Sequence, residues 1–231
     1  MITLRPSRER GHFDHGWLDT FHSFSFGGYR DPRQMGFRSL RVINEDRVAP
    51  GSGFGEHPHH DMEILTYILS GELQHRDSLG SGDVIRQGEW QRMTAGTGIT
   101  HSEFNPSASE TVHLLQIWIL PNAKGHTPSY EQRALPPAGP NQWRLIASPD
   151  GRDDSLTIQQ DALLQQANLT AGGTLDYRFA PGRYGWLQVA RGSLQLGDQL
   201  LQAGDGAALT EETALTLRAS TDADVLLFDM N

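Results

Sequence analysis

The chain has 231 residues, of which 37% are hydrophobic and 20% charged, so it can bury a core and shows no disordered or fibrous bias. Its formal charge of −9 argues against a protein that coats nucleic acid or anionic membranes. There is no cysteine, which excludes disulfides, thiolate metal sites and thiol catalysis. All ten histidines lie between His12 and His126, so any imidazole chemistry belongs to the first half of the chain.

Short strand patterns dominate the chain. β-branched, leucine and aromatic residues, bounded mostly by Gly, Pro, Asn or Asp, form six segments: 38–43, 63–69, 112–120, 184–189, 193–196 and 225–228. Because short strands at this spacing are typical of sandwiches and barrels, we predict an all-β fold. The best helical candidate is residues 161–168, with Asp161 as its N-cap.

A proline-rich segment separates two related halves. Residues 121–140 contain five prolines and little strand pattern, which predicts an ordered connector. Residues 67–74 and 187–195 repeat one outline, a strand, a glycine turn and a second strand, which favours an internal duplication. We therefore predict two domains, an N-terminal one over residues 1–130 and a C-terminal one over residues 131–231.

The pattern of apolar and charged residues in the sequence predicts neither a targeting signal nor a membrane-spanning segment. The first ten residues become charged and meet a proline before an apolar segment forms, unlike a secretory signal. The longest apolar stretches are strand-sized, far short of a membrane span. The predicted location is therefore the cytoplasm.

Four side chains in two glycine-rich segments predict a metal site. His57 and His59 are two residues apart, as are His101 and Glu103, so within each strand the pair projects to one side. If these strands face each other across a barrel, three imidazoles and one carboxylate converge, a donor set that suits a first-row transition metal. A His-Pro-His-His run is also common in surface loops, but the joint pattern favours the metal site. Of the other histidines, we expect packing or hydrogen-bonding roles for His12, His15 and His22, and His60 should point away from His57 and His59 because its parity is opposite. No partner at ligand spacing is found for His75, His113 or His126.

Both segments resemble cupin signatures. Four residues match the first signature: Gly51, His57, His59 and Glu63. Three match the second: Gly98, His101 and Asn105. The chain departs from the usual pattern at Gly71, which falls one residue late, and at Trp90 and Gly96, where Gly and Pro are usual.

Those departures point to one branch of the cupins. Residues 15–26 and 93–103 are similar to the pirin family, and within it to bacterial pirin-like proteins with quercetin 2,3-dioxygenase activity. The resemblance covers essentially the whole chain. It implies a bicupin, two face-to-face jelly-roll-like β-barrels, with one metal in the N-terminal barrel and none in the C-terminal barrel. The ligands it implies are His57, His59, His101 and Glu103. The ion is one divalent transition metal, with Fe2+ as the first choice and Ni, Cu, Zn, Mn and Co as alternatives.

Glu63 is a second candidate carboxylate. In typical cupins the Glu of the first signature binds the metal, whereas in pirins the ligand follows the third His by two residues, here Glu103. Glu63 has the same strand parity as His57 and His59. It is therefore retained as an alternative ligand or as a carboxylate that supports the ligands.

The resemblance implies an enzyme that opens the heterocycle of flavonols such as quercetin with O2. Glu103 is its expected general base, taking the proton of the substrate 3-hydroxyl. Four apolar residues are candidates for the substrate wall, or else for the core: Phe54, Met62, Met93 and Ile99. The expected partners are a flavonol or other small aromatic molecule and O2, with no nucleic acid or membrane, and the chain is expected to be a monomer.

Two other functions are considered. Eukaryotic pirins are similar to transcriptional cofactors, so a metal-binding regulatory protein without significant turnover, acting on a protein partner, is the alternative. A cupin isomerase or sugar-binding module is disfavoured, because the N-terminal run and Glu103 are both present.

Overall fold

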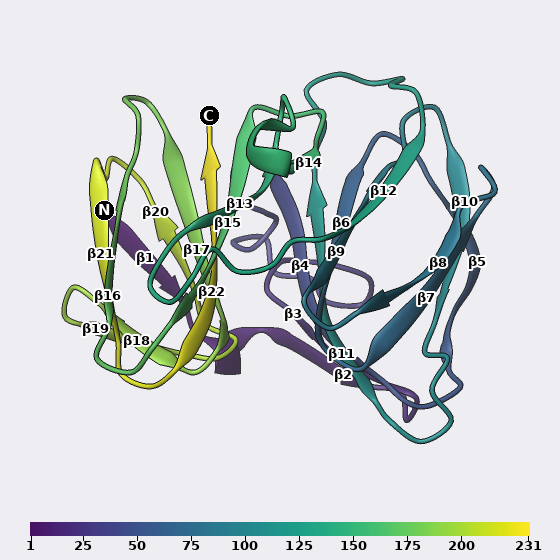
Figure 1. The fold of residues 1–231 in the computed structure, drawn as a ribbon, viewed down its shortest axis with the longest axis horizontal. Coiled ribbons are helices and arrows are strands. Elements are labelled where there is room, and N and C mark those ends of the chain that lie inside the picture. Colours follow the sequence, from purple (N-terminus) through teal and green to yellow (C-terminus); the bar gives the residue numbers. More distant parts are fainter. The chain divides into compact units, whose positions relative to one another are not determined.

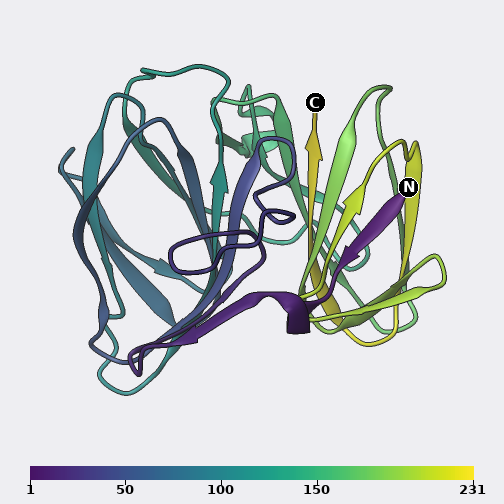
Figure 2. The same cartoon turned by 180° about the vertical axis from the view of Figure 1, so that it is seen from behind.

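The computed structural model describes residues 1–231 and consists of β-strands with two short 3-10 turns, η1 (Ser7–Glu9) and η2 (Arg152–Asp154) (Figures 1 and 2). This confirms the predicted all-β fold. The predicted helix is wrong, because residues 161–168 fall almost entirely in strand β15 (Ala162–Leu169). β15 pairs with a strand on each side, and this tertiary pairing overrides a short helical pattern. No helix is long and apolar enough to cross a membrane.

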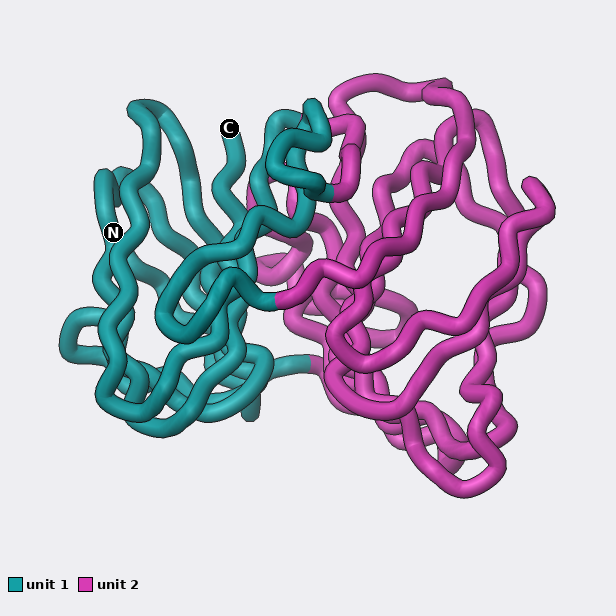
Figure 3. The backbone as a smooth tube through the Cα atoms, viewed as in Figure 1, with its two compact units in different colours: residues 1–10, 137–155, 161–231 teal, residues 11–136, 156–160 magenta.

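The chain divides into two compact units, coloured teal and magenta in Figure 3. Unit 1 comprises residues 1–10, 137–155 and 161–231, and unit 2 comprises residues 11–136 and 156–160. The predicted division into domains 1–130 and 131–231 stays a prediction. Residues 121–140, predicted as an ordered connector with little strand pattern, contain strand β12 (Ser129–Ala134), which pairs with β9 (Glu89–Thr94).

Unit 2 is built from two antiparallel sheets. The large sheet has the order β12-β9-β6-β11-β4-β3-β2, and the small sheet has the order β5-β10-β7-β8. Its other strands are β2 (Gly11–Asp14), β3 (Leu18–His22), β4 (Leu40–Val48), β5 (Gly53–His59), β6 (Glu63–Ser70), β7 (Glu72–Asp77), β8 (Gly82–Arg86), β10 (Ile99–Phe104), β11 (Val112–Ile119) and β14 (Leu156–Thr157). One apolar cluster contains Ile68 and Leu114 of the large sheet with Leu73 and Ile85 of the small sheet. The facing surfaces of the two sheets therefore pack against each other.

Unit 1 repeats this plan without histidines. The strands of this unit follow the order β1-β20-β17-β22-β15-β13 in one sheet and β16-β21-β18-β19 in the other. Its other strands are β1 (Ile2–Arg5), β13 (Arg144–Ser148), β16 (Thr174–Arg178), β17 (Tyr184–Arg191), β18 (Ser193–Leu196), β19 (Gln199–Gln202), β20 (Gly206–Leu209), β21 (Ala214–Ala219) and β22 (Ala223–Met230). Its buried cluster consists of Leu, Val, Ala and Phe side chains. Both groups of side chains that could hold a metal ion lie in unit 2, and the prediction that the C-terminal barrel binds no metal stays a prediction.

One glycine in each unit marks where the chain passes from the large sheet to the small one. Gly71 lies between β6 and β7 with φ +77°, and Gly192 lies between β17 and β18 with φ +73°. Both have the left-handed conformation that favours glycine. These equivalent corners support the internal repeat predicted from the sequence.

Gly192→Ala is expected to destabilise unit 1 more than Gly197→Ala does. Both glycines are left-handed, so alanine costs about 1–2 kcal/mol at either position. A Cβ on Gly192 would also lie 1.9 Å from the carbonyl oxygen of Asp222, whereas a Cβ on Gly197 meets nothing within 4 Å. Overpacking adds about 1–3 kcal/mol to the first variant alone. Urea denaturation of both variants measures the difference, and equal midpoints would show that the corner relaxes without cost.

Candidate metal centre

The predicted ligand strands are neighbours in the small sheet of unit 2. β10 pairs with β5 in antiparallel register, with His101 opposite His57 and Ile99 opposite His59. The expectation that these strands face each other across a barrel is therefore wrong. Cross-strand pairing on one face of one sheet brings the imidazoles together instead, because directly opposed side chains lie about 5 Å apart at Cβ.

The nitrogens of His57, His59 and His101 lie within 4.8 Å of one another. The Nε2 atoms of His57 and His101 are 3.0 Å apart, the separation that two adjacent ligands at about 2.1 Å from one ion require. His57 Nδ1 lies 2.8 Å from the carbonyl oxygen of Gly55, so it donates there and leaves the Nε2 lone pair for an ion. The three histidines therefore fit a transition metal ion.

Two of these imidazoles are neutral at pH 7. Burial, followed by the charges of His101 and His57, lowers the pKa of His59 to about 4. Burial, followed by the charges of His57 and His75, lowers the pKa of His101 to about 3. Because a metal binds the unprotonated ring, both side chains are ready ligands without first losing a proton.

Glu103 is held by two amide side chains of the large sheet. It projects from β10 on the same face as His101 and is only 2% exposed. Its ligand oxygen lies within 4.8 Å of the ligand nitrogens of His75 and His101. Its Oε1 accepts a hydrogen bond from Gln91 Nε2 and its Oε2 accepts one from Gln116 Nε2, both at 2.8 Å.

These amides belong to a closed circuit of hydrogen bonds, the glutamine clamp, formed by Gln91, Thr66 and Gln116 around Glu103. The three lie side by side on β9, β6 and β11, because they are register partners. Thr66 Oγ1 accepts from Gln91 Nε2 at 2.8 Å and donates to Gln116 Oε1 at 2.9 Å. The direction of every bond in the circuit is thus defined, so the clamp fixes both the position and the rotation of the carboxylate.

Glu63 lies outside this centre. It is fully buried at the start of β6, where its Oε2 accepts a hydrogen bond from Thr94 Oγ1 at 2.9 Å. Its Oε1 is buried without a hydrogen-bond partner. Burial raises the pKa of Glu63 to about 7, and the Thr94 hydroxyl opposes that shift.

We expect Glu63→Gln to stabilise the metal-free protein increasingly as the pH rises. Since the pKa of Glu63 is higher in the folded protein than in the unfolded chain, the folded state binds its proton more tightly and wild-type stability falls as the pH passes from 4.5 to about 7. The neutral amide of the variant does not titrate and has no such loss. The free energy of unfolding of Glu63→Gln therefore rises relative to that of the wild type by up to about 3 kcal/mol over this range. Urea titrations of both proteins between pH 4.5 and 8 measure it. A difference that stays constant with pH would contradict the shifted pKa.

A cavity of about 300 Å3 opens beside the three histidines. Of the four predicted wall residues, only Phe54 lines it. Met93 and Ile99 lie in a buried cluster with Ile64, and Met62 packs against that cluster. The cavity walls are provided instead by Phe13, Leu18, Phe26, Ile64 and Trp118, with the polar side chains Thr20, His22, Asn44, Asp46 and Gln116.

Several of these residues were not identified from the sequence. Gln116 interrupts an apolar strand, and Asn44 and Asp46 occupy inward positions of β4. Polar residues at buried strand positions are a signal of a site, but their partners lie on strands distant in sequence. His75, which has no partner at ligand spacing in the sequence, lies in space with His101 and Glu103 in a second potential ligand group.

Comparison with known proteins finds relatives that match both halves of the chain. The chain matches the family model described as Pirin over residues 3–119 and that described as Quercetinase C-terminal cupin domain over residues 145–230. This confirms the prediction of two cupin domains. It is 48% identical over 230 residues to a quercetin 2,3-dioxygenase of Escherichia coli (strain K12), covering 100% of this chain and 99% of that protein. It is 39% identical to a pirin-like protein of Caulobacter vibrioides, covering 99% of each.

Among solved structures, it is similar to the bacterial pirin YhhW from Escherichia coli in complex with nickel(II). The TM-score is 0.95 at 47% identity, and the match covers 100% of this chain and 99% of the other. Both halves of the chain are thus matched in sequence and in fold. These matches, together with the paired His-x-His and His-x-Glu strands, show that the chain belongs to the pirin family.

Proposed function

We propose that this chain is a metal-dependent quercetin 2,3-dioxygenase, which opens the heterocycle of a flavonol with O2 and releases carbon monoxide. The observation that supports it most is a group of three histidines, one of which, His101, also lies within ligand distance of the clamped carboxylate of Glu103, at the wall of an aromatic-lined cavity. The full-length similarity to a quercetin 2,3-dioxygenase supports the same reaction. The protein is proposed to act as a monomer.

The metal ligands in this proposal are His57, His59, His101 and Glu103, and the ion is divalent, with Fe2+ as the first choice. Three nitrogens and one oxygen also suit Ni, Cu, Zn, Mn and Co, and the similar YhhW structure contains nickel(II). When bound, the ion supplies Lewis acidity that lowers the pKa of the substrate 3-hydroxyl.

The side chains of the cavity handle the substrate and its proton. Glu103 takes the proton of the 3-hydroxyl as general base, and its clamp keeps the carboxylate aimed at that position. Phe26 and Trp118 meet edge to face, with ring centroids 5.2 Å apart, and form an apolar wall for a flat ring. This wall excludes water from the reacting carbons.

Oxygen uptake and loss of flavonol absorbance test the proposal. Protein loaded with iron, nickel or copper is expected to consume one O2 for each quercetin lost and to release one carbon monoxide. Turnover of a few per minute or less with every metal would contradict a dioxygenase. It would favour the alternative, a metal-binding regulatory protein with a protein partner.

A further inference from the structure

A polar patch lies on the inner face of β3 and β4, and the proposed metal chemistry does not use it. The β3–β4 patch consists of Thr20 and His22 on β3, opposite Asp46 and Asn44 on β4. All four side chains line the cavity and are between 3% and 5% exposed. Two register pairs thus place four buried polar groups side by side on a wall that is otherwise mostly apolar.

The bonds within the patch leave acceptors for a ligand. Thr20 Oγ1 donates to Asp46 Oδ1 at 2.5 Å and lies 2.9 Å from His22 Nε2, which donates to it. Asn44 Oδ1 is buried with no hydrogen-bond partner. A buried polar atom without a partner costs about 1–3 kcal/mol, so such an atom on a cavity wall indicates a ligand donor that satisfies it.

The chemistry of the patch selects the kind of donor. A carboxylate and an amide oxygen accept hydrogen bonds, and the neighbouring walls of Phe13, Phe26 and Trp118 suit a flat ring. A ring that packs on these walls occupies the same cavity as the β3–β4 patch. Hydroxyl groups are substituents that donate hydrogen bonds without bringing a charge into this buried patch.

We infer that the β3–β4 patch binds hydroxyl groups on a benzene ring of the substrate, so the site selects polyhydroxylated aromatic molecules over unsubstituted ones. This inference rests on the proposed flavonol ring opening, and it assigns Asn44 and Asp46 a role in specificity. The patch and the metal ligands then fix the substrate at two separated points.

The test compares quercetin with 3-hydroxyflavone, which has no hydroxyl on either benzene ring. Metal-loaded wild type is expected to prefer quercetin by at least about tenfold in kcat/KM. Asn44→Leu and Asp46→Asn are expected to reduce this preference, mainly by raising KM for quercetin. Glu45→Gln is the control, since Glu45 lies between them on β4 and contacts His113 and Arg47 instead. It should keep the wild-type preference.

Equal kcat/KM values for both flavonols in the wild type, or an unchanged preference in both patch variants, would overturn the inference. If no metal-loaded protein turns over either flavonol, the proposed reaction fails. In that case, calorimetric measurement of the binding of both flavonols to the same proteins tests the role of the patch independently of turnover. A wild-type preference that disappears in the patch variants supports it, and equal affinities overturn it.

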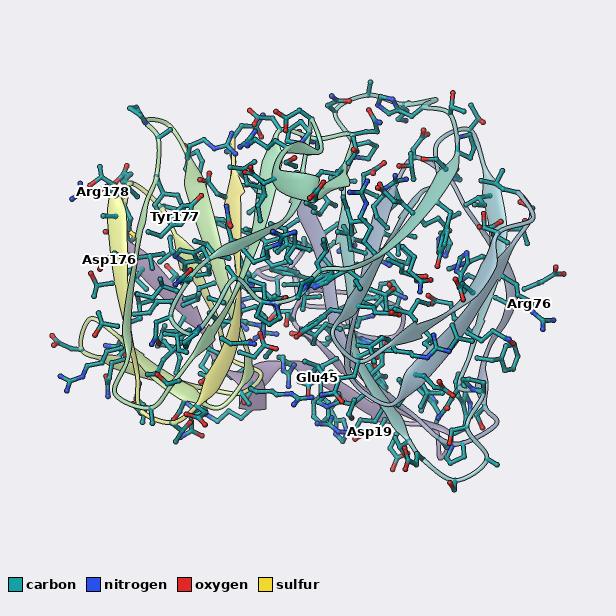
Figure 4. All side chains as sticks on the ribbon, viewed as in Figure 1. Asp19, Glu45, Arg76, Asp176, Tyr177 and Arg178 are labelled. Carbon is teal, nitrogen blue, oxygen red and sulfur yellow. The ribbon has the colours of Figure 1, made fainter.

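A second, independent observation concerns the ring nitrogen of His101 that points away from His57. His75 Nδ1 lies 3.4 Å from His101 Nδ1, and His75 Nε2 lies 2.9 Å from Asp77 Oδ2. The side chains of His75 and Asp77 are completely buried. Arg76 between them is exposed and points away from the barrel, as strand alternation requires (Figure 4).

The carboxylate determines where each proton in this row lies. Asp77 can only accept, so His75 carries its proton on Nε2 and its Nδ1 is an acceptor. His101 therefore carries its proton on Nδ1, and its Nε2 lone pair faces His57. The backbone N–H groups of Leu79 and Ser81 hold Asp77 Oδ1 at 2.9 and 3.0 Å, which anchors the row.

The geometry points to His75 and Asp77 as positioning residues that set the tautomer of His101 for metal binding. A group that fixes the tautomer of a metal ligand is worth about 10–100-fold in metal affinity. We therefore expect His75→Phe, which can still stack on Tyr130, and Asp77→Asn each to weaken metal binding by about that factor.

Competition with a chelator measures the affinity, and 1H–15N NMR of the metal-free protein reads the tautomer of each histidine. His101 should carry its proton on Nδ1 in the wild type and be a mixture of tautomers in both variants. His113→Phe is the control histidine of the same unit, outside the row. An Nε2–H tautomer of His101 in the wild type, or affinities within twofold of it in both variants, would overturn this assignment. If His75→Phe fails to fold, the metal affinity and the His101 tautomer of Asp77→Asn test the assignment.

Discussion

His101→Ala is expected to abolish both stoichiometric metal binding and flavonol turnover. His101 is the buried member of the triad and lies opposite His57, so its loss removes the one nitrogen of the set that β10 provides. The remaining histidines are partly exposed and lie on one strand. Two ligands on one strand hold an ion much more weakly than three held by two paired strands, so the affinity should fall by well over 100-fold, beyond the effect of losing a supporting contact.

Metal analysis of protein purified without chelators or a nickel column measures this loss, together with oxygen uptake on quercetin. His60→Ala is the matched control. His60 follows His59 in the chain, but its side chain is 79% exposed, and it belongs to no ligand group. Wild-type turnover by a His101→Ala protein that contains no metal would show that the reaction takes place elsewhere.

Glu103→Gln is expected to lower kcat by about 10²–10⁴-fold, the usual contribution of a general base. The amide has nearly the shape of the carboxylate but takes no proton. It also presents an N–H group to a clamp whose two amides donate, so one hydrogen bond of the circuit is lost. Metal binding should weaken and still be measurable, which separates this variant from His101→Ala.

Glu63→Gln is the control for this variant. The cupin pattern makes Glu63 the carboxylate ligand and the pirin pattern makes it Glu103, and the two variants together distinguish these assignments. Glu63 contacts Thr94 and does not line the cavity, so its amide variant should keep kcat within about twofold and bind metal normally. Steady-state kinetics with saturating metal test both variants. The opposite result, an active Glu103→Gln and a metal-free Glu63→Gln, would assign the ligand role to Glu63.

The predicted metal ligands depended on a local property of the chain. Side chains two residues apart in a strand share a face, so His57 with His59 and His101 with Glu103 could be paired from spacing alone. The prediction that the strands oppose each other across the barrel failed, because the pairing of distant strands is not a local property. The same reason explains the missed strand β15, where neighbours in the sheet decided the structure of a short, ambiguous segment.

By itself, the sequence determined the all-β class, the restriction of imidazole chemistry to the first half and the two ligand pairs. Each of these depends on composition or on contacts between residues close in the chain. Only the tertiary structure decided which polar residues support them. The glutamine clamp, the β3–β4 patch and the row behind His101 each join side chains from different strands through their register. Register is set by packing of the whole barrel, so no local pattern of residues could have identified these partners.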